Sequence, residues 1–242
     1  MRETDAARPA AFAPPVTANA DLATLMTLFS AAFPIGSFAF SHGLEAAVAE
    51  GRVQTAGDVR DWLAVLLSRG SGWNDLVLMS LAHRAVKNED AVALEELATL
   101  ATALCGSAER RHEMMSLGAA FLAAASPWTG SASMPKAGIG DADTAPLPVA
   151  SGAVAALAGL PLSPSLVGYA QSFASSLVSA TVRLVPLGQS EWVVIIRDLM
   201  PTIVETAERA SVSTLDDLGS AAIVSDIAAM RHETLATRLF RS

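Results

Sequence analysis

Ser41 is the first residue whose surroundings suggest chemistry. The sequence AFSHG (residues 39–43) approximates the Gly-x-Ser-x-Gly turn that presents the nucleophile of serine hydrolases, and Asp226 and His232 follow in the order that a triad needs. That turn joins a strand to a helix, whereas the residues before Ser41 predict a helix followed by a Pro-Gly turn. A serine that caps a helix beside a tight turn at Gly43 is the simpler interpretation, with a serine hydrolase as the alternative.

Two histidines form the other candidate site. His112 and His232 each lie in an Arg-His-Glu tripeptide, and neither tripeptide extends to the HExxH spacing that places two imidazoles on one face of a helix for zinc. A stand-alone helical nickel carrier that uses these two side chains is a second alternative. Cys105 is the only cysteine and is expected to be a small buried side chain. With no phosphate-binding loop and no GxGxxG, the sequence predicts no cofactor.

Composition excludes several classes of protein. The net charge of -8 disfavours a nucleic-acid partner, because an acidic surface repels phosphates. No run of about 18 apolar residues predicts a membrane span, and the first twenty residues lack the apolar stretch of a signal peptide, so a cytoplasmic protein is expected. The hydrophobic share of 52% is high, and burial between subunits or against partners would account for it.

Periodicity predicts an all-α fold. The expected helices cover residues 21–33, 41–50, a segment capped by Thr55, and residues 74–87, 90–104, 107–125, 149–158, 163–184, 190–209 (kinked or broken at Pro201) and 220–240. The segment WVVII (192–196) could form a strand, but its neighbours favour helix. We therefore expect one compact, bundle-like domain over residues 21–242, with a disordered segment at 1–20 and a long flexible loop at 126–148.

The last predicted helix carries two apolar stripes. One contains Ile223, Ile227 and Met230, and the other contains Val224, Ala228, Leu235 and Leu239. One stripe can meet the core of the domain, and the other would then meet a partner. The alternative is that both are buried in the core. The sequence thus favours a C-terminal interaction helix.

Three segments together resemble the signature stretches of a known family. PIGSFAFSHGLE (34–45), RLVPLGQ (183–189) and RHETLATRLFRS (231–242) are similar, in order and approximate spacing, to those of the UreF urease accessory proteins. The resemblance runs from about Leu22 to Ser242. The chain departs from the family pattern at Ala39, at Phe40, where the family usually has an aromatic hydroxyl, and at residues 190–192 and 236–237.

The resemblance implies a helical, two-fold dimer without catalytic activity. Such a protein would join the accessory protein UreD (also called UreH), recruit the GTPase UreG, and act in nickel insertion into apo-urease. Whether it would accelerate or restrain GTP hydrolysis is left open. The partner-binding residues that the resemblance implies are Phe38, Phe40, Ser41, His42, Glu45, Gln189, His232, Glu233, Arg238, Leu239, Phe240 and Arg241.

Overall fold

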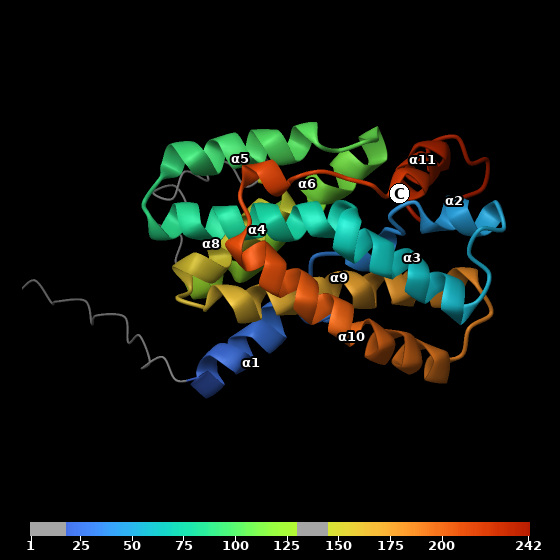
Figure 1. The fold of residues 1–242 in the computed structure, drawn as a ribbon, viewed down its shortest axis with the longest axis horizontal. Coiled ribbons are helices and arrows are strands. Elements are labelled where there is room, and N and C mark those ends of the chain that lie inside the picture. The colour runs from blue at the N-terminus through green and yellow to red at the C-terminus, as the bar shows by residue number, and fades with distance from the viewer. Residues whose placement is uncertain (1–17, 130–144) are drawn as a thin grey trace, which may run out of the picture.

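The computed structural model describes residues 18–129 and 145–242, and this part of the chain contains helices and no strands (Figure 1). The helices are α1 (Ala18–Leu28), η1 (Ser37–Ala39), α2 (Leu44–Ala49), α3 (Ala56–Arg69), α4 (Ser71–Lys87), α5 (Ala91–Ala103), α6 (Ala108–Thr129), α8 (Leu147–Leu157), α9 (Leu162–Leu184), α10 (Gln189–Val212), η3 (Leu215–Asp217) and α11 (Ile223–His232). The predicted all-α fold is confirmed, and residues 192–196 are helical.

Helices α4 and α8 form the centre of the molecule, and α3, α5, α6, α9 and α10 pack around them (Figure 1). Nearly every residue of α8 is buried, as expected for a helix that is apolar on all sides. The contact between α4 and α8 depends on small residues. A Cβ atom at Gly152 would lie 2.3 Å from the carbonyl oxygen of Met79 and 3.0 Å from the Cβ of Ala82. Only glycine at this position allows the two backbones to approach so closely.

Helix α1 begins earlier than the sequence predicts. Its first residue, Ala18, lies inside the segment predicted to be disordered, while residues 1–17 lie outside the described part of the chain. Leu25 and Leu28 face the core, whereas Leu22 and Met26 are 56% and 68% exposed. The apolar stripe predicted for this helix is therefore only partly buried by the rest of the chain.

The loop predicted at residues 126–148 is wrong at both ends. Helix α6 continues through Pro127 to Thr129, and α8 already begins at Leu147. The ring of Trp128, in this last turn of α6, packs against that of Phe33 with the centroids 6.2 Å apart but stays 36% exposed. Proline fits the first turn of α8, where the N–H that it lacks would have no partner. Residues 130–144 lie outside the described part.

The helix predicted at residues 220–240 is also wrong in extent. Helix α11 ends at His232, and the last residues then fold back along the chain before α2. Tertiary hydrogen bonds from the backbone of this tail replace the helical ones, which helix periodicity alone cannot reveal. By contrast, α10 runs without a break through Pro201, and Thr55 caps α3 with a capping box. None of the described helices combines the length and apolar character of a membrane span.

Candidate functional site

Two of the segments that resemble the UreF family come together at one end of the bundle. The turn before α2, the first turns of α6, helix α11 and the chain end lie side by side there (Figure 1). We call this region the C-terminal junction; it comprises residues 39–45, 108–113 and 223–242. His42 and Gly43 both adopt left-handed backbone conformations, with φ of 60° and 79°. A Cβ atom at Gly43 would lie 2.8 Å from the backbone of Ala229, so glycine lets α11 pack directly on this turn.

The chain end is held mainly through its backbone. The N–H groups of Leu239 and Phe240 donate to the carboxylate of Glu45 at 2.6 and 3.0 Å. The N–H of Arg241 donates to the carbonyl of Ala39 at 2.9 Å, and the N–H of Ser41 donates to the carbonyl of Ser242 at 2.8 Å. The Ser41 hydroxyl donates to the same carbonyl of Ser242. These bonds fix the tail independently of most of its side chains.

His232 lies at the centre of the C-terminal junction and is fully buried. Its Nδ1 is 2.6 Å from Oε2 of Glu109, and its Nε2 is 3.0 Å from Oε2 of Glu45. Both contacts are hydrogen bonds only when both ring nitrogens carry a proton. Burial by itself would raise the pKa of Glu45, but the N–H of Leu239 and the His232 ring outweigh it and hold the pKa below its usual value. Glu45 is therefore a charged carboxylate, and it links α2 to α11 and to the tail.

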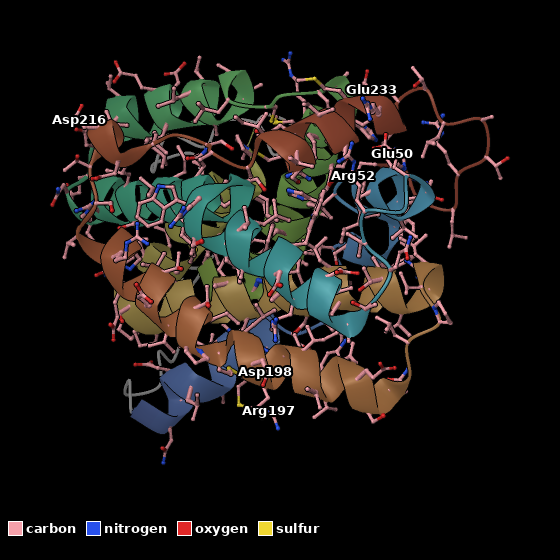
Figure 2. The ribbon with its side chains drawn as sticks, turned by 45° about the vertical axis from the view of Figure 1, so that its right-hand side comes forward. Glu50, Arg52, Arg197, Asp198, Asp216 and Glu233 are labelled. Carbon is pink, nitrogen blue, oxygen red and sulfur yellow. The ribbon has the colours of Figure 1, made fainter. Side chains whose placement is uncertain are left out.

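The neighbours of His232 attach α11 to two other helices. Glu233 accepts hydrogen bonds from the N–H groups of Ala108 and Glu109 at 2.8 and 3.3 Å, so it caps the start of α6. Arg231 pairs with Glu50 at 2.8 Å, at the end of α2, where Glu50 also pairs with Arg52 (Figure 2). In the tail, Arg238 pairs with Glu109. The Arg-His-Glu tripeptide at 231–233 thus anchors α11 to α2 and α6.

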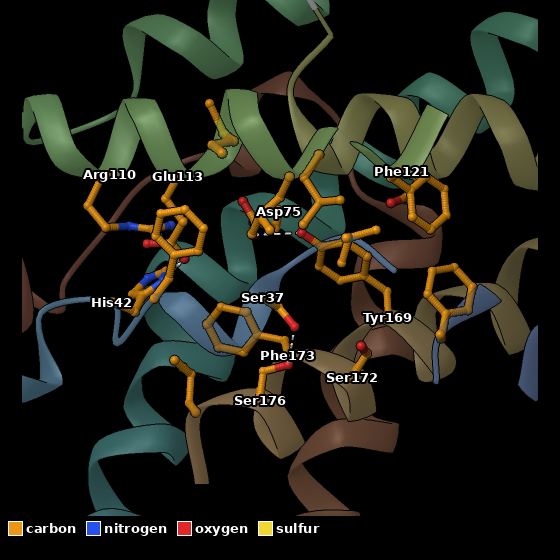
Figure 3. A pocket seen from close by; sticks show the side chains of 18 of the residues that line it. Ser37, His42, Asp75, Arg110, Glu113, Phe121, Tyr169, Ser172, Phe173 and Ser176 are labelled. Atoms are coloured by element: carbon orange, nitrogen blue, oxygen red, sulfur yellow. Dashed lines mark hydrogen bonds and ion pairs between the residues drawn. The ribbon is translucent and has the colours of Figure 1, made fainter. Parts of the chain in front are cut away.

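A second buried group of charges adjoins the first (Figure 3). Glu113 pairs with Arg110, accepts a hydrogen bond from the Ser242 hydroxyl, and lies 3.4 Å from Nδ1 of His42. Burial alone would raise the pKa of Glu113, but Arg110 and His42 hold it well below its usual value. On the far side of the ring, Nε2 of His42 lies 2.5 Å from the hydroxyl of Ser71. Burial and the nearby Arg110 lower the pKa of His42.

Next to this group, a buried carboxyl lies against a phenol. The hydroxyl of Tyr169 donates to Oδ2 of Asp75 at 2.8 Å (Figure 3). Burial raises the pKa of Asp75 to about 6, against the opposing effects of Arg110 and of the Tyr169 hydrogen bond. Both side chains line a small cavity of about 70 Å³ that is otherwise mostly apolar. This part of the protein thus contains an ionisable group whose charge changes near neutral pH.

The third resembling segment reaches the C-terminal junction through Arg183. The guanidinium of Arg183 lies 4.1 Å from the centre of the Phe240 ring and donates to the carbonyl of Phe38 at 2.5 Å. Phe240 is buried, whereas the Phe38 side chain is 75% exposed. Gln189 is exposed at the first position of α10, a helix that contains none of the other residues implied by the resemblance.

Several residues of the C-terminal junction and its surroundings were missed by the sequence analysis. These are Ser71, Asp75, Glu109, Arg110, Glu113, Tyr169, Arg183 and Ser242. Glu113 belongs to the tripeptide at 111–113, which had been searched only for metal-binding spacing. Most of these residues are far in sequence from their partners: 29 positions separate Ser71 from His42, 94 separate Asp75 from Tyr169, and 129 separate Ser242 from Glu113. Only the tertiary fold brings them together.

The two alternative sites are not assembled as predicted. Ser41 is bonded to Ser242 and to the N–H of Glu45, while His232 is occupied by two glutamates and Asp226 accepts from Ser220. His112 is exposed, and its ring lies 6.4 Å from that of Phe40, centroid to centroid. Among the described residues, no group of three or more His, Cys, Asp or Glu side chains could hold a metal ion.

Helix α11 presents an apolar face to solvent. Its exposed side carries Ile223, Val224, Ile227 and Met230, while Ala228, Ala229 and His232 face the domain. The first predicted stripe is thus entirely exposed, and the second is divided between Ala228, which is buried, and Val224 and Leu239, which are exposed. A short helix with this much exposed apolar surface, fixed from behind by the contacts of the buried His232, has the features of a protein-binding element.

The fold and the site define a helical protein whose distinguishing feature is the exposed apolar face of α11, which hydrogen bonds to α2 and α6 hold in place. The UreF family model matches residues 53–200. UreF of Agrobacterium fabrum is 48% identical over 225 residues, which cover 92% of this chain and 97% of that protein. UreF 1 of Brucella canis is 48% identical and UreF of Mesorhizobium japonicum 47% identical, each over 91% of this chain and over 94% and 96% of the respective relative. The chain belongs to the UreF family of urease accessory proteins.

Proposed function

We propose that this chain is a cytoplasmic scaffold for urease maturation, which joins UreD (UreH) and recruits the GTPase UreG so that nickel can be inserted into apo-urease. Membership of an accessory-protein family and the relatives' names support the general role. The observation that supports a scaffold in particular is the exposed apolar face of α11, which contacts of the buried His232 with Glu45 and Glu109 hold in place from behind. The chain itself performs no chemistry in this proposal.

The apolar face of α11 is held rigidly, which favours binding of a partner. A binding helix that is already ordered loses little conformational entropy when a partner docks. Here His232 bridges carboxylates of α2 and α6, and Glu233 caps α6, so α11 cannot shift without breaking these hydrogen bonds, of which the one between His232 and Glu45 is buried. Around it, the exposed Leu239, Arg238 and Arg241 lie in the same segment of chain and would form the rim of the interface. Phe38 would extend it beyond the tail.

A substitution on this face tests the proposal. Ile227→Glu places a charge in the centre of the apolar face, where it should abolish co-purification of UreD and UreG while leaving the helical fold intact. Val92→Glu on α5 is the matched control, because Val92 is also an exposed apolar residue, 67% exposed, on a different helix. Equal recovery of partners by both variants, with unchanged circular dichroism, would refute an interface on α11.

The proposal includes a homodimer. The apolar share of 52% and the exposed apolar side chains of α1 and α10 support self-association. These side chains are Leu22, Met26, Val193, Val194, Met200 and Val204. Sedimentation equilibrium at micromolar concentration should give twice the chain mass of 25.0 kDa. A single species of 25.0 kDa would contradict the dimer and leave the α11 proposal standing.

A further inference from the structure

A serine that the sequence analysis did not consider has the surroundings of a nucleophile. The hydroxyl of Ser71 lies 2.5 Å from Nε2 of His42, and Nδ1 of the same ring lies 3.4 Å from Oε1 of Glu113. The three residues come from the start of α4, the turn before α2 and the first turns of α6. Serine, imidazole and carboxylate in this order, one at each ring nitrogen, form the hydrogen-bonded relay that activates serine in hydrolases on unrelated folds.

We propose that Ser71 is a catalytic nucleophile, with His42 as its general base and Glu113 as the positioning carboxylate, and that it hydrolyses small esters. This activity is separate from the scaffold role, and neither depends on the other.

The three groups are in the protonation states that such a relay needs. A general base must be neutral before the reaction, and burial and Arg110 favour the neutral form of His42. Glu113 is a carboxylate, because Arg110 and His42 outweigh the effect of burial on its pKa. A charged Glu113 selects the tautomer of His42 with the proton on Nδ1, which leaves Nε2 free to accept the proton of Ser71.

The surroundings of Ser71 provide space and access. Ser71 is partly exposed and lines a cavity of about 190 Å³, together with His42, Asn74, Asp75 and Asp226. The guanidinium of Arg110 lines the same cavity, so its wall carries charges of both signs, and the volume limits the acyl group to a few heavy atoms. Ser41, by contrast, is fully buried and its hydroxyl is already bonded to the chain end. The structure thus moves the candidate nucleophile from Ser41 to Ser71.

The start of α4 supplies a place for negative charge. Ser71 is the first residue of this 17-residue helix, and no side chain caps it within the described residues. The N–H groups in the first turn of a helix have no partner inside the helix and carry partial positive charge. An oxyanion that forms next to Ser71 would lie near these groups, as in other hydrolases that place the nucleophile at a helix N-terminus.

The reaction balances with water as the only co-reactant. The Ser71 oxygen bonds to the ester carbonyl carbon while Nε2 of His42 takes the hydroxyl proton. The tetrahedral intermediate collapses, the C–O bond to the alcohol breaks, and His42 returns that proton to the departing alcohol. Water then attacks the acyl-serine with His42 again as base, which releases the acid and restores the Ser71 hydroxyl. No redox step or metal is needed.

Covalent labelling of the full-length protein tests this proposal. A small, uncharged fluorophosphonate should attach once per chain, and peptide mass spectrometry should place the adduct on Ser71. Ser71→Ala should abolish labelling, whereas Ser190→Ala, at an exposed serine on α10, should not change it. His42→Gln should slow labelling at least about 100-fold, which is the usual contribution of a general base. Turnover of p-nitrophenyl acetate should follow the same pattern.

The pH profile gives a second readout that needs no variant. Burial and Arg110 from α6 lower the pKa of His42, while Glu113 from α6 and Asp226 from α11 raise it. The effect of burial is the largest, so the pKa lies below its usual value. The labelling rate should therefore rise with pH and level off at a lower pH than for a free imidazole. Absence of an adduct on Ser71, or equal labelling of the wild-type and folded His42→Gln proteins, would overturn the proposal without affecting the scaffold role.

Discussion

The α4–α8 contact and the C-terminal junction hold the molecule together by different means. Between α4 and α8, small and apolar side chains let two helices approach closely, and Gly152 lies against the backbone of Met79. At the C-terminal junction, segments that are far apart in the sequence meet through charges and backbone hydrogen bonds, with Glu45 and Glu113 as the central acceptors. The α4–α8 contact thus depends on close packing, whereas the C-terminal junction depends on hydrogen bonds and charges that satisfy buried polar groups.

This difference determines how each region tolerates change. Close packing fails when volume is added, because neighbouring backbones cannot move apart locally. A buried ionic group fails when one partner is removed, because the remaining charge is left without compensation. At the C-terminal junction, replacing both partners of a buried pair should therefore cost less stability than replacing one. At the α4–α8 contact, a second substitution cannot make room for added volume in the same way. The four predictions that follow use this contrast, in order of decreasing effect.

Gly152→Leu should have the largest effect. The new side chain would have to occupy space taken by the Met79 carbonyl and the Ala82 methyl group, 2.3 and 3.0 Å from its Cβ. We expect no cooperative unfolding transition in urea, because α8 could not dock on α4. Gly57→Ala in α3 is the control: its Cβ would meet only the Thr55 hydroxyl at 3.6 Å, and it should stabilise the protein by up to about 1 kcal/mol. A folded Gly152→Leu protein would contradict close packing at this contact.

Glu113→Leu should lower the free energy of unfolding by about 3–5 kcal/mol, since it leaves Arg110 buried without its partner. The Arg110 side chain is only 13% exposed, so solvent cannot replace the carboxylate. The double variant Arg110→Met, Glu113→Leu should recover more than half of that loss, as measured by urea unfolding of all four proteins in a double-mutant cycle. Additive losses would show that the pair is not coupled.

Helical periodicity in the sequence predicted the α4–α8 region well and the C-terminal junction hardly at all. The run from Val149 to Ala158 is so apolar that a buried helix follows from periodicity alone. The C-terminal junction depends instead on pairings such as His232 with Glu45, 187 positions apart, which no local pattern encodes. Family resemblance located His42, Glu45 and His232, but not Arg110 or Glu113. The error over the last helix has the same origin, because Glu45 binds the N–H groups of Leu239 and Phe240 that a helix would have used internally.

The tail offers two neighbouring residues for the third prediction. Phe240 is 4% exposed and lies under Arg183, whereas Leu239 is 60% exposed. Phe240→Ala should therefore lower the free energy of unfolding by about 3 kcal/mol, and Leu239→Ala by less than about 0.5 kcal/mol. Removal of residues 238–242 should destabilise the domain at least as much as Phe240→Ala. Unchanged thermal unfolding after both Phe240→Ala and the truncation would contradict this prediction and would leave the tail a role in partner binding alone.

The fourth prediction concerns Asp75, which lies between the two regions on α4. Its pKa in the folded protein is about 6, against a usual value of 3.8. Between these pH values the folded state binds more protons than the unfolded chain, so the contribution of Asp75 to stability falls as the pH rises through this window. Two pKa units correspond to about 3 kcal/mol, and water in the adjacent cavity should reduce the effect to about 2 kcal/mol.

Asp75→Asn removes this titration while keeping an oxygen that can accept the Tyr169 hydroxyl. Glu45 and Glu113 also make stability depend on pH, but their pKa values are lowered, so they act in the opposite direction and are common to both proteins. The useful quantity is therefore the difference in unfolding free energy between Asp75→Asn and the wild type, measured in urea from pH 4 to pH 7. It should shift in favour of Asp75→Asn by about 2 kcal/mol, with most of the change below pH 6. Because the Tyr169 hydrogen bond favours the charged carboxyl, Tyr169→Phe should move that window to higher pH, and a difference that stays constant with pH would show that Asp75 is charged throughout.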